Sequence, residues 1–412
     1  MINFNSYLTE DKGGKNLHLE HIEDEILNFG ITGGRAAINF VRSLRDMLAG
    51  EARSSVNMTV KWDGAPAIFA GVDPEDGKFF VAKKSVFNAT PKLYKTAAEI
   101  DEDGLSGALN TKFKIALEEF SKLGITGVLQ GDLMFTSEDK GNEKIDGKSF
   151  ITFQPNTIVY AVDPTSDIGK QINSAKIGIV WHTTYKGNTF ESMKASYGVD
   201  ISKFRSKTVW SQDAMLRDLS KYTMSEKETG AVNAHLSNAG KIFNKISGTT
   251  LRTIEANPTL AQHIETHNNT YVRAGTVIGN TTRHVSSLIT WISKKYQKEI
   301  DSRKTERGKG AQQAKLNALL DFFTVKNKNS LKLLFDLQKE LVLAKLILIN
   351  KLNKLSSVNT FVKTNKGYAT TGPEGYVAID KIGGDALKIV DRMEFSYNNF
   401  SPNVLKGWDK GR

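Results

Sequence analysis

Apolar positions in the first part of the chain follow a helical period. Between residues 17 and 29 they lie three or four residues apart, at Leu19, Ile22, Ile26 and Phe29. This spacing places side chains on one face of a helix. Glycines at 30, 33 and 34 break the pattern, and a second helical stretch then extends to Gly50. The sequence therefore predicts a helical segment over residues 1–55.

Short β-prone runs alternate with Gly, Asp and Pro turns over residues 56–190. The predicted strands are 58–61, 67–72, 78–82, 127–135, 157–162 and 177–183. One helix, at about 109–123, interrupts them. This pattern is typical of an α+β domain with a mostly antiparallel sheet.

The pattern becomes helical again from residue 191 to residue 365. Its most apolar stretch, 331–349, contains several charged residues, which predicts a helix buried on one side. Residues 302–309 are predicted to form an exposed loop. The stretch 301–354 holds 12 Lys/Arg and 5 Asp/Glu, so much of the net charge of +11 lies in this block. Such a charge favours a nucleic-acid partner; the alternative is a block that only stabilises the fold or contacts proteins.

Strand-like runs return at 374–379 and 386–390, and they are too few to form a domain alone. We therefore interpret 191–365 as a helical insertion. It divides one domain into a first part, 56–190, and a last part with the tail, 366–412.

Length and composition narrow the possible classes of protein. The 412 residues suffice for two or three domains. The absence of cysteine excludes disulfides, cysteine-ligated zinc, iron–sulfur clusters and thiol catalysis. Residues 1–15 lack the apolar core of a signal peptide, and no stretch is apolar enough to span a membrane. We therefore expect a cytoplasmic protein without a membrane partner.

The run Lys61-Trp62-Asp63-Gly64 carries the strongest candidate chemistry. Its lysine ends a predicted strand, and an acid and a turn-forming glycine follow. This layout presents an amine at the floor of a pocket, where it can attack an electrophile. The alternative is a strand that ends in an ordinary polar turn.

Further candidate residues follow at or near predicted strands: Lys84, Asp132, Tyr160, Glu374 and Lys388. Each has a structural alternative. The acids can belong to turns, the lysines can be solvated, and Tyr160 can be a core aromatic, with Phe153 and Trp181 as rivals for a stacking role. The run 18–25 holds two histidines and four acids; a solvated helix face is a better interpretation of it than a metal site.

This series resembles the covalent nucleotidyltransferase superfamily, which contains ATP-dependent DNA and RNA ligases and RNA capping enzymes. Lys61 matches the nucleophile of K-x-D-G, and Gly131-Asp132 matches the G-E motif with Asp for Glu. Glu374-Gly375-Tyr376-Val377 matches E-G-x-V, and Lys388 matches the final K-x-K motif, reduced to one lysine. The resemblance covers about 56–190 and 366–395. It implies an antiparallel-sheet nucleotidyltransferase core with an N-terminal helical segment and a large helical insertion.

The resemblance also assigns roles to residues. Lys61 would take AMP from ATP, and Lys388, with Lys381 as a further cation, would assist catalysis. Glu374 and Asp132 would hold Mg²⁺, Asp132 alternatively binding the ribose. The nucleotide site would comprise Val60, Asp63, Gly64, Lys84, Asp132, Tyr160, Glu374 and Lys388, with Tyr160 stacked on the adenine. One departure is Pro66, near the position where DNA ligases and capping enzymes have an arginine.

The physical requirements agree with these roles. An amine that attacks the α-phosphate of ATP must be unprotonated, and a free lysine at neutral pH is not. Neighbouring cations lower the pKa of such a lysine. Mg²⁺ prefers a few carboxylates together with water and phosphate oxygens.

Only 24 residues follow Lys388, too few for the OB-fold domain that DNA ligases and capping enzymes place there. We therefore expect an ATP-dependent RNA-ligase-like enzyme that joins 5′-phosphate to 3′-hydroxyl ends, with RNA favoured over DNA. One alternative is a catalytically silent protein that binds nucleic acid or belongs to a virion, since the chain also resembles uncharacterised proteins of T4-like tailed phages. If the chain is encoded by such a phage, we expect it in the cytoplasm of the host. Another is AMP transfer to a protein acceptor.

Overall fold

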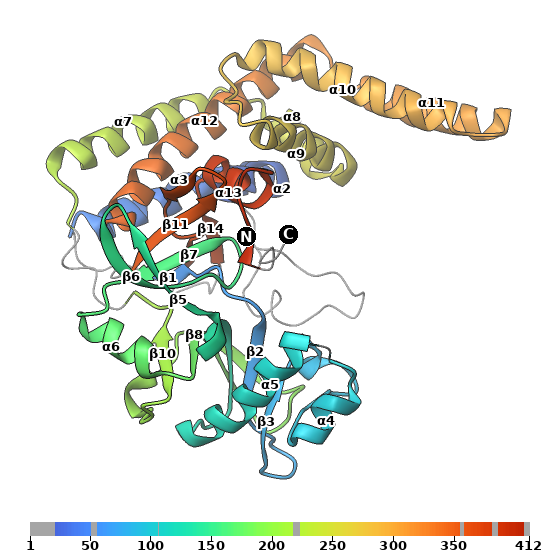
Figure 1. The fold of residues 1–412 in the computed structure, drawn as a ribbon. Coiled ribbons are helices and arrows are strands. Elements are labelled where there is room, and N and C mark those ends of the chain that lie inside the picture. Colours follow the sequence, from blue (N-terminus) through green and yellow to red (C-terminus); the bar gives the residue numbers. More distant parts are fainter. Residues whose placement is uncertain are drawn as a thin grey trace.

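The computed structural model describes residues 21–50, 56–105, 107–216, 223–354, 358–380 and 386–407. A helical lobe lies on one side and a β-rich lobe on the other, with a small sheet between them (Figure 1). The mixed α/β class with antiparallel sheets is confirmed. No helix of the described residues is long and apolar enough to cross a membrane.

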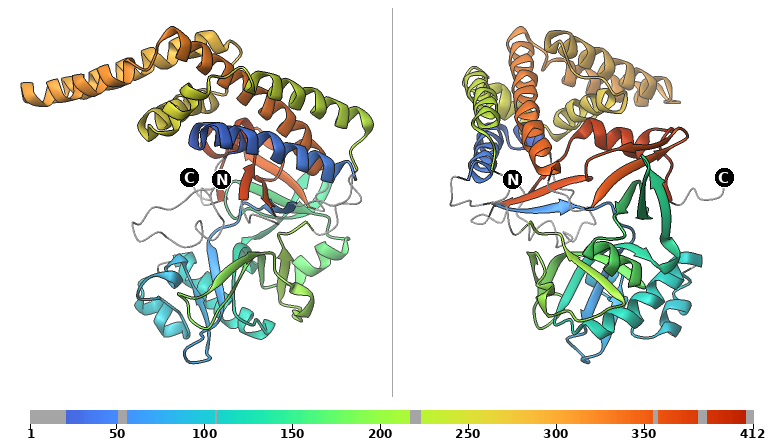
Figure 2. Two further views of the ribbon diagram at one scale, coloured as in Figure 1. Left: turned by 180° about the vertical axis from the view of Figure 1, so that it is seen from behind. Right: turned by 60° about the vertical axis from the view of Figure 1, so that its left-hand side comes forward.

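The helical lobe combines the N-terminal region with the central part of the chain and one helix near the C-terminus. It comprises η1 (Ile22–Asp24), α2 (Glu25–Asn28), α3 (Gly30–Leu48), α7 (Glu226–Phe243), α8 (Gly248–Glu255), α9 (Pro258–Arg273), α10 (Thr281–Asp301), α11 (Glu306–Leu320), α12 (Val325–Asn353) and α13 (Arg392–Phe400). The longest helix, α12, packs against α3, α7 and α10 (Figures 1 and 2). Leucines and other apolar residues along α12 are buried in this core.

The predicted break is confirmed at Gly30, where α2 has ended at Asn28 and α3 begins with φ of 49°, but Gly33 and Gly34 lie within α3. A side chain at Gly33 would lie 2.0 Å from the Glu25 carbonyl oxygen, and one at Gly34 would lie 2.6 Å from Phe243. Gly33 and Gly34 therefore permit close packing of α3 on α2 and α7 without breaking α3.

Three sheets form the rest of the fold. The first has the order β1-β13-β14: β1 (Val56–Lys61), β13 (Gly375–Asp380) and β14 (Ala386–Ile389). The second has the order β10-β8-β4-β2-β3, with β9 beside β8: β10 (Val209–Asp213), β8 (Ile177–Lys186), β4 (Val128–Thr136), β2 (Ala67–Val72), β3 (Phe79–Ala82) and β9 (Lys194–Tyr197). The third has the order β12-β11-β7-β6-β5: β12 (Gly367–Thr370), β11 (Asn359–Thr364), β7 (Ile158–Val162), β6 (Lys148–Phe153) and β5 (Lys140–Ile145).

Shorter helices lie between these strands: η2 (Lys84–Phe87), α4 (Ala97–Glu102), α5 (Gly107–Phe120), η3 (Ser121–Leu123), η4 (Ser137–Asp139), α6 (Asp167–Ser174) and η5 (Ile201–Lys203). The first two sheets are joined near the end of β1. The Val60 amide donates to the Ala214 carbonyl at 2.9 Å, and the Leu216 amide donates to the Met58 carbonyl at 2.8 Å. Residues of both sheets therefore meet at one place.

The helical block is narrower than the predicted 191–365. Strands β9 and β10 pair with β8 and extend the β-rich lobe to Asp213, while β11 pairs with β7 on one side and with β12 on the other. These strands are short and β9 is polar, so their strand character depends on pairing partners that lie far away in sequence. Of the returning strands, β13 pairs with β1 and β14 pairs with β13, so they form a sheet with β1 rather than joining the sheet of β2, β4 and β8. The predicted loop at 302–309 is also shorter, since α11 begins at Glu306.

Buried histidines in the helical lobe predict a loss of stability in acid. Burial lowers the pKa of His267 to about 4 and, together with the charge on His267, the pKa of His284 to about 3. The unfolded chain therefore binds protons first as the pH falls below about 6.5, so stability falls from there towards pH 3–4. We expect a loss of about 2 kcal/mol per histidine at pH 5. Urea unfolding at pH 7 and pH 5 measures it.

The matched control is the double variant His267→Gln, His284→Gln. Its amides do not titrate, and they can replace the contacts that the rings make with Ser287 and Asn268. We expect a flatter dependence on pH for this variant. An equal dependence in variant and parent would contradict the assignment.

Candidate functional site

Lys61 and Glu374 are brought together by the pairing of β1 with β13. Lys61 ends β1 opposite Gly375, and its ammonium forms an ion pair with the Glu374 carboxylate. Gly375 has φ of 144°, and a side chain there would lie 2.5 Å from Val390. A glycine is therefore required next to Glu374 for this strand to begin where it does. Burial raises the pKa of Glu374, and the Lys61 charge opposes that change.

The turn after Lys61 is fixed by the buried carboxylate of Asp63. That carboxylate accepts hydrogen bonds from the Asn156 side chain at 2.6 Å and from the amides of Thr157 at 2.7 Å and Ile158 at 2.8 Å. These contacts attach the turn to the start of β7. With its oxygens occupied, Asp63 positions the lysine.

Gly64 lies directly against the acid of β4. A side chain at Gly64 would come within 2.6 Å of the Asp132 Cβ, and the next amide, of Ala65, donates to the Leu133 carbonyl at 2.9 Å. The turn therefore passes over β4 and holds Lys61 near Asp132. Any larger residue at position 64 would displace this turn.

His182 stands beside Asp132 because of a β-bulge. Gln130 pairs with Thr183 and Gly131 pairs with Trp181, which leaves His182 as the extra residue of β8. Bulges of this kind redirect side chains next to functional sites. The His182 Nε2 lies 3.8 Å from the Asp132 Oδ2, and both side chains are about one-quarter exposed.

The positive charge of Lys61 affects the pKa values of both Asp132 and His182. Burial raises the pKa of Asp132 to about 7, although the Lys61 charge opposes the change. Burial and Lys61 together lower the pKa of His182 to about 4. His182 is therefore neutral at pH 7. Its imidazole carries no positive charge that could stabilise the Asp132 carboxylate.

These residues line one cavity of about 230 Å³ between the first and second sheets. Lys388 of β14 lies opposite Val377 of β13, and both line this cavity. Its complete lining is Thr59, Val60, Lys61, Trp62, Gln130, Asp132, Val180, His182, Thr183, Tyr197, Ala214, Val377 and Lys388. The structure thus brings Val60, Lys61, Asp132 and Lys388 together from distant parts of the sequence, with Glu374 attached through Lys61.

Tyr160 does not face this cavity. Its ring is 1% exposed and lies in the core, and its hydroxyl accepts a hydrogen bond from the Asp63 amide at 2.7 Å. The predicted stacking of Tyr160 on adenine is therefore wrong, because β7 directs this side chain inward. Its rivals Phe153 and Trp181 are buried as well.

Trp62 lines the cavity directly beside Lys61, and Tyr197 is a second aromatic residue of the lining. Its ring stacks on Tyr160 with ring centres 5.1 Å apart. Tyr160 thus supports the tryptophan from behind. The sequence signal was present, since Trp62 is the variable position of K-x-D-G, but its direction depends on the turn that Asp63 anchors.

Lys84 lies outside the cavity lining. It follows β3, at the same end of the second sheet as Asp132 but two strands away, or roughly 10 Å at the usual strand spacing. Lys381 lies outside the described residues. Lys84 therefore does not line the site as it stands.

No group of three or more His, Cys, Asp or Glu side chains among the described residues could hold a metal unaided. Asp132 nevertheless offers a carboxylate to the cavity, and Mg²⁺ commonly binds to one or two carboxylates together with substrate phosphates. The donor set therefore suits a metal that arrives with a nucleotide. Glu374 is engaged by Lys61, which makes it the weaker of the two predicted metal ligands.

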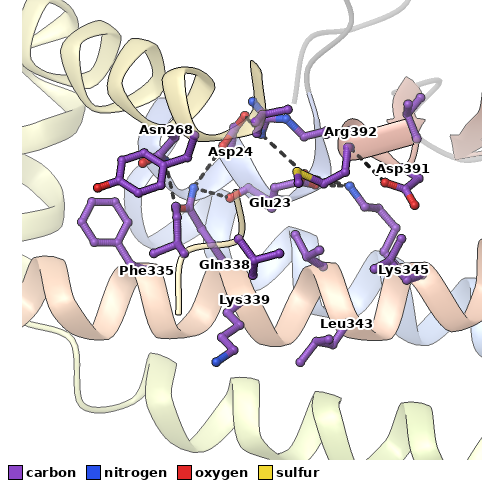
Figure 3. A pocket seen from close by; sticks show the side chains of 18 of the residues that line it. Glu23, Asp24, Asn268, Phe335, Gln338, Lys339, Leu343, Lys345, Asp391 and Arg392 are labelled. Atoms are coloured by element: carbon purple, nitrogen blue, oxygen red, sulfur yellow. Dashed lines mark hydrogen bonds and ion pairs between the residues drawn. The ribbon is translucent and has the colours of Figure 1, made fainter. Parts of the chain in front are cut away.

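A second cavity, of about 240 Å³, lies in the helical lobe between α9, α12 and the start of α13 (Figure 3). Apolar side chains line most of it, and ion pairs close one side. Glu23 lies between Lys345 and Arg392, and Asp24 accepts from Arg392 at 2.8 Å. The prediction of a solvated acidic face over 18–25 is therefore wrong for Glu23, Asp24 and Glu25, which are buried. Residues 18–20 lie outside the described residues.

Comparison with known protein families matches residues 16–404 to a family of unknown function (DUF6267). No curated protein and no solved structure matches the chain.

Proposed function

The chain belongs to this family of unknown function, and we propose from its own site that the protein is an ATP-dependent polynucleotide ligase of the nucleotidyltransferase kind. One observation carries the proposal. Lys61, ion-paired with Glu374, shares a cavity with Asp132 and Lys388, residues that come from three separate segments of the chain. An amine, an acid and a second cation in one cavity are what nucleotidyl transfer to a lysine requires.

The reaction has three steps. The Lys61 ammonium first loses one proton, and its Nζ then attacks the α-phosphorus of ATP. A P–N bond forms as the P–O bond to pyrophosphate breaks, pyrophosphate leaves, and the nitrogen loses a second proton and keeps one hydrogen. The 5′-phosphate of a polynucleotide then attacks the same phosphorus and releases the lysine. Finally, a 3′-hydroxyl attacks the activated 5′-phosphate, and AMP leaves. RNA is the expected polynucleotide from the motif resemblance.

The remaining residues have supporting roles. Glu374 accepts from the Lys61 ammonium and keeps it at the end of β1. Lys388 would neutralise phosphate charge from the opposite strand. Asp132 would hold Mg²⁺ together with the nucleotide phosphates, or bind the ribose hydroxyls. Bound there, Mg²⁺ would supply charge that stabilises the leaving pyrophosphate.

Trp62 is expected to stack on the adenine. Trp62→Ala should weaken ATP binding roughly tenfold to a hundredfold, since base–aromatic stacking contributes about 1–3 kcal/mol. Titration calorimetry with ATP measures this effect. The control is Tyr160→Phe, which keeps the aromatic support behind Trp62 and removes only the buried hydroxyl. An equal loss of affinity in both variants would show that Trp62 has no specific contact with the base.

Two alternatives to the ligase predict a different fate of the AMP. A protein acceptor would receive AMP in the second step, and a catalytically silent protein, virion-associated or bound to nucleic acid, would never be labelled. Both are tested by adding 5′-phosphorylated RNA, 5′-phosphorylated DNA or candidate proteins to the protein after labelling with α-labelled ATP. Transfer of the label to RNA, followed by sealing to a 3′-hydroxyl, supports the ligase. Transfer only to protein, or to no acceptor, would overturn it.

A further inference from the structure

Helices α10 and α11 form a hairpin that projects from the helical lobe (Figures 1 and 2). A short turn joins them, and α11 packs back along α10. Their seam is apolar and buries the side chains of Ile292, Tyr296, Ile300, Leu316 and Leu319. The hairpin is about 30 Å long, because each residue of α10 adds about 1.5 Å.

The projecting helix contributes little to the rest of the fold. Within the described residues, α11 makes extensive contact with α10 alone. It adds no residue to the Lys61 cavity or to the cavity of the helical lobe. Ordering this helix costs conformational entropy, and the apolar contact with α10 must compensate for that cost. Its outer surface is therefore where a function is expected.

That outer surface is basic. Residues 294–315 contain eight Lys/Arg and three Asp/Glu, a net charge of +5. Arg303, Lys304 and Arg307 are exposed together at the tip. Of the three acids, Glu306 pairs with Lys309 at 2.7 Å and Asp301 accepts from Gln297 at 2.8 Å. The tip therefore holds three exposed cations against two acids that neighbouring side chains already engage, and an external polyanion would stabilise these cations.

The chemistry of the hairpin narrows the choice of polyanion. The exposed large hydrophobic side chains of the described residues are Val277, Val325, Leu343, Tyr397 and Phe400, and none lies on α10 or α11. Insertion into a membrane surface needs apolar side chains beside the basic ones, and a protein interface usually has an apolar core. A phosphodiester backbone needs only cations along its length.

We infer that the tip of the α10–α11 hairpin, Arg303, Lys304 and Arg307, binds the phosphodiester backbone of a nucleic acid. The inference deepens the proposed function, since a polynucleotide ligase needs a surface that holds its substrate. Binding at the tip requires neither ATP nor the Lys61 reaction. The hairpin and the catalytic cavity can therefore be tested separately.

The test compares two triple variants that lose the same charge. The first is Arg303→Gln, Lys304→Gln, Arg307→Gln; the control is Lys144→Gln, Lys148→Gln, Lys194→Gln, three exposed lysines of the β-rich lobe. Fluorescence anisotropy with labelled single-stranded RNA and duplex DNA is measured over a range of salt concentrations. Circular dichroism confirms that both variants are folded.

For the tip variant we expect about tenfold weaker binding or more, and a salt dependence reduced by about two to three counterions. The control should bind within about twofold of the parent. The effect on RNA, on DNA or on both supports the inference and identifies the nucleic acid. Equal losses of nucleic-acid binding in the two variants, or no loss in the tip variant, would overturn it. Polyglutamate serves as a polyanion without phosphates, and if the tip variant lost polyglutamate binding as strongly as nucleic-acid binding, the inference would also be overturned.

Lysyl-AMP formation is measured in the same preparations. If the parent forms no lysyl-AMP but the tip variant still loses nucleic-acid binding, the proposed function fails and the inference stands. If the parent forms lysyl-AMP and the tip variant binds nucleic acid normally, the inference fails and the proposed function stands.

Discussion

Lys61→Ala is expected to abolish the formation of protein-bound adenylate from ATP. The Lys61 Nζ is the nucleophile at the cavity between the first and second sheets, and no other described lysine shares its ion pair with Glu374. Loss of a covalent nucleophile leaves no route to the same intermediate, so labelling should fall by at least about a thousandfold. Incubation with α-labelled ATP and Mg²⁺, followed by denaturing electrophoresis, measures the label.

Two control variants separate chemistry from structure. Lys61→Arg keeps the positive charge beside Glu374, but a guanidinium is not a nucleophile, so this variant should remain folded and unlabelled. Lys144→Ala removes an exposed lysine far from the cavity and should be labelled like the parent. Substantial label on Lys61→Ala or Lys61→Arg would place the adenylate elsewhere.

Lys345→Ala is expected to cost about 3–5 kcal/mol of unfolding free energy. Lys345 is 1% exposed, and its ammonium donates to both oxygens of Glu23, at 2.8 and 2.7 Å. Burial alone would raise the pKa of Glu23, but Lys345 and Arg392 hold it at about 2. Removing the lysine leaves a buried carboxylate with one weaker partner, Arg392 at 3.5 Å. Urea denaturation at neutral pH measures the loss.

Two comparison variants test this prediction. One changes another lysine of α12, and the other removes both charges of the Lys345–Glu23 pair. Lys339→Ala, an exposed position of α12, should change stability by less than about 0.5 kcal/mol. Lys345→Met combined with Glu23→Gln removes both charges and should recover much of the loss. Equal stabilities of Lys345→Ala and Lys339→Ala would show that the buried pair contributes little.

Local patterns were sufficient to predict many of the strands. Strand β2 was predicted at its observed bounds, and β3, β4, β7 and β14 within one or two residues, because alternation and turn residues are local signals. Strands β5, β6, β9, β10, β11 and β12 were missed. These strands are more polar or shorter, and they are stabilised by pairing with partners that no local pattern specifies.

The site was predicted in part, for a related reason. Motif order indicated Lys61, Asp132, Glu374 and Lys388, whose proximity follows from the pairing of β1, β13 and β14 and from the turn over β4. The roles of the neighbouring side chains depend on the direction in which each side chain points, and the sequence does not give this direction. Tyr160 points into the core, and the bulge in β8 turns His182 towards Asp132.

The most direct test of the central claim is peptide mapping by mass spectrometry of the parent protein after incubation with ATP and Mg²⁺. The account predicts one adenylate per chain, attached to the Nζ of Lys61 and released by added pyrophosphate. A protein that stays unmodified under these conditions, or an adenylate on any other residue, would contradict it.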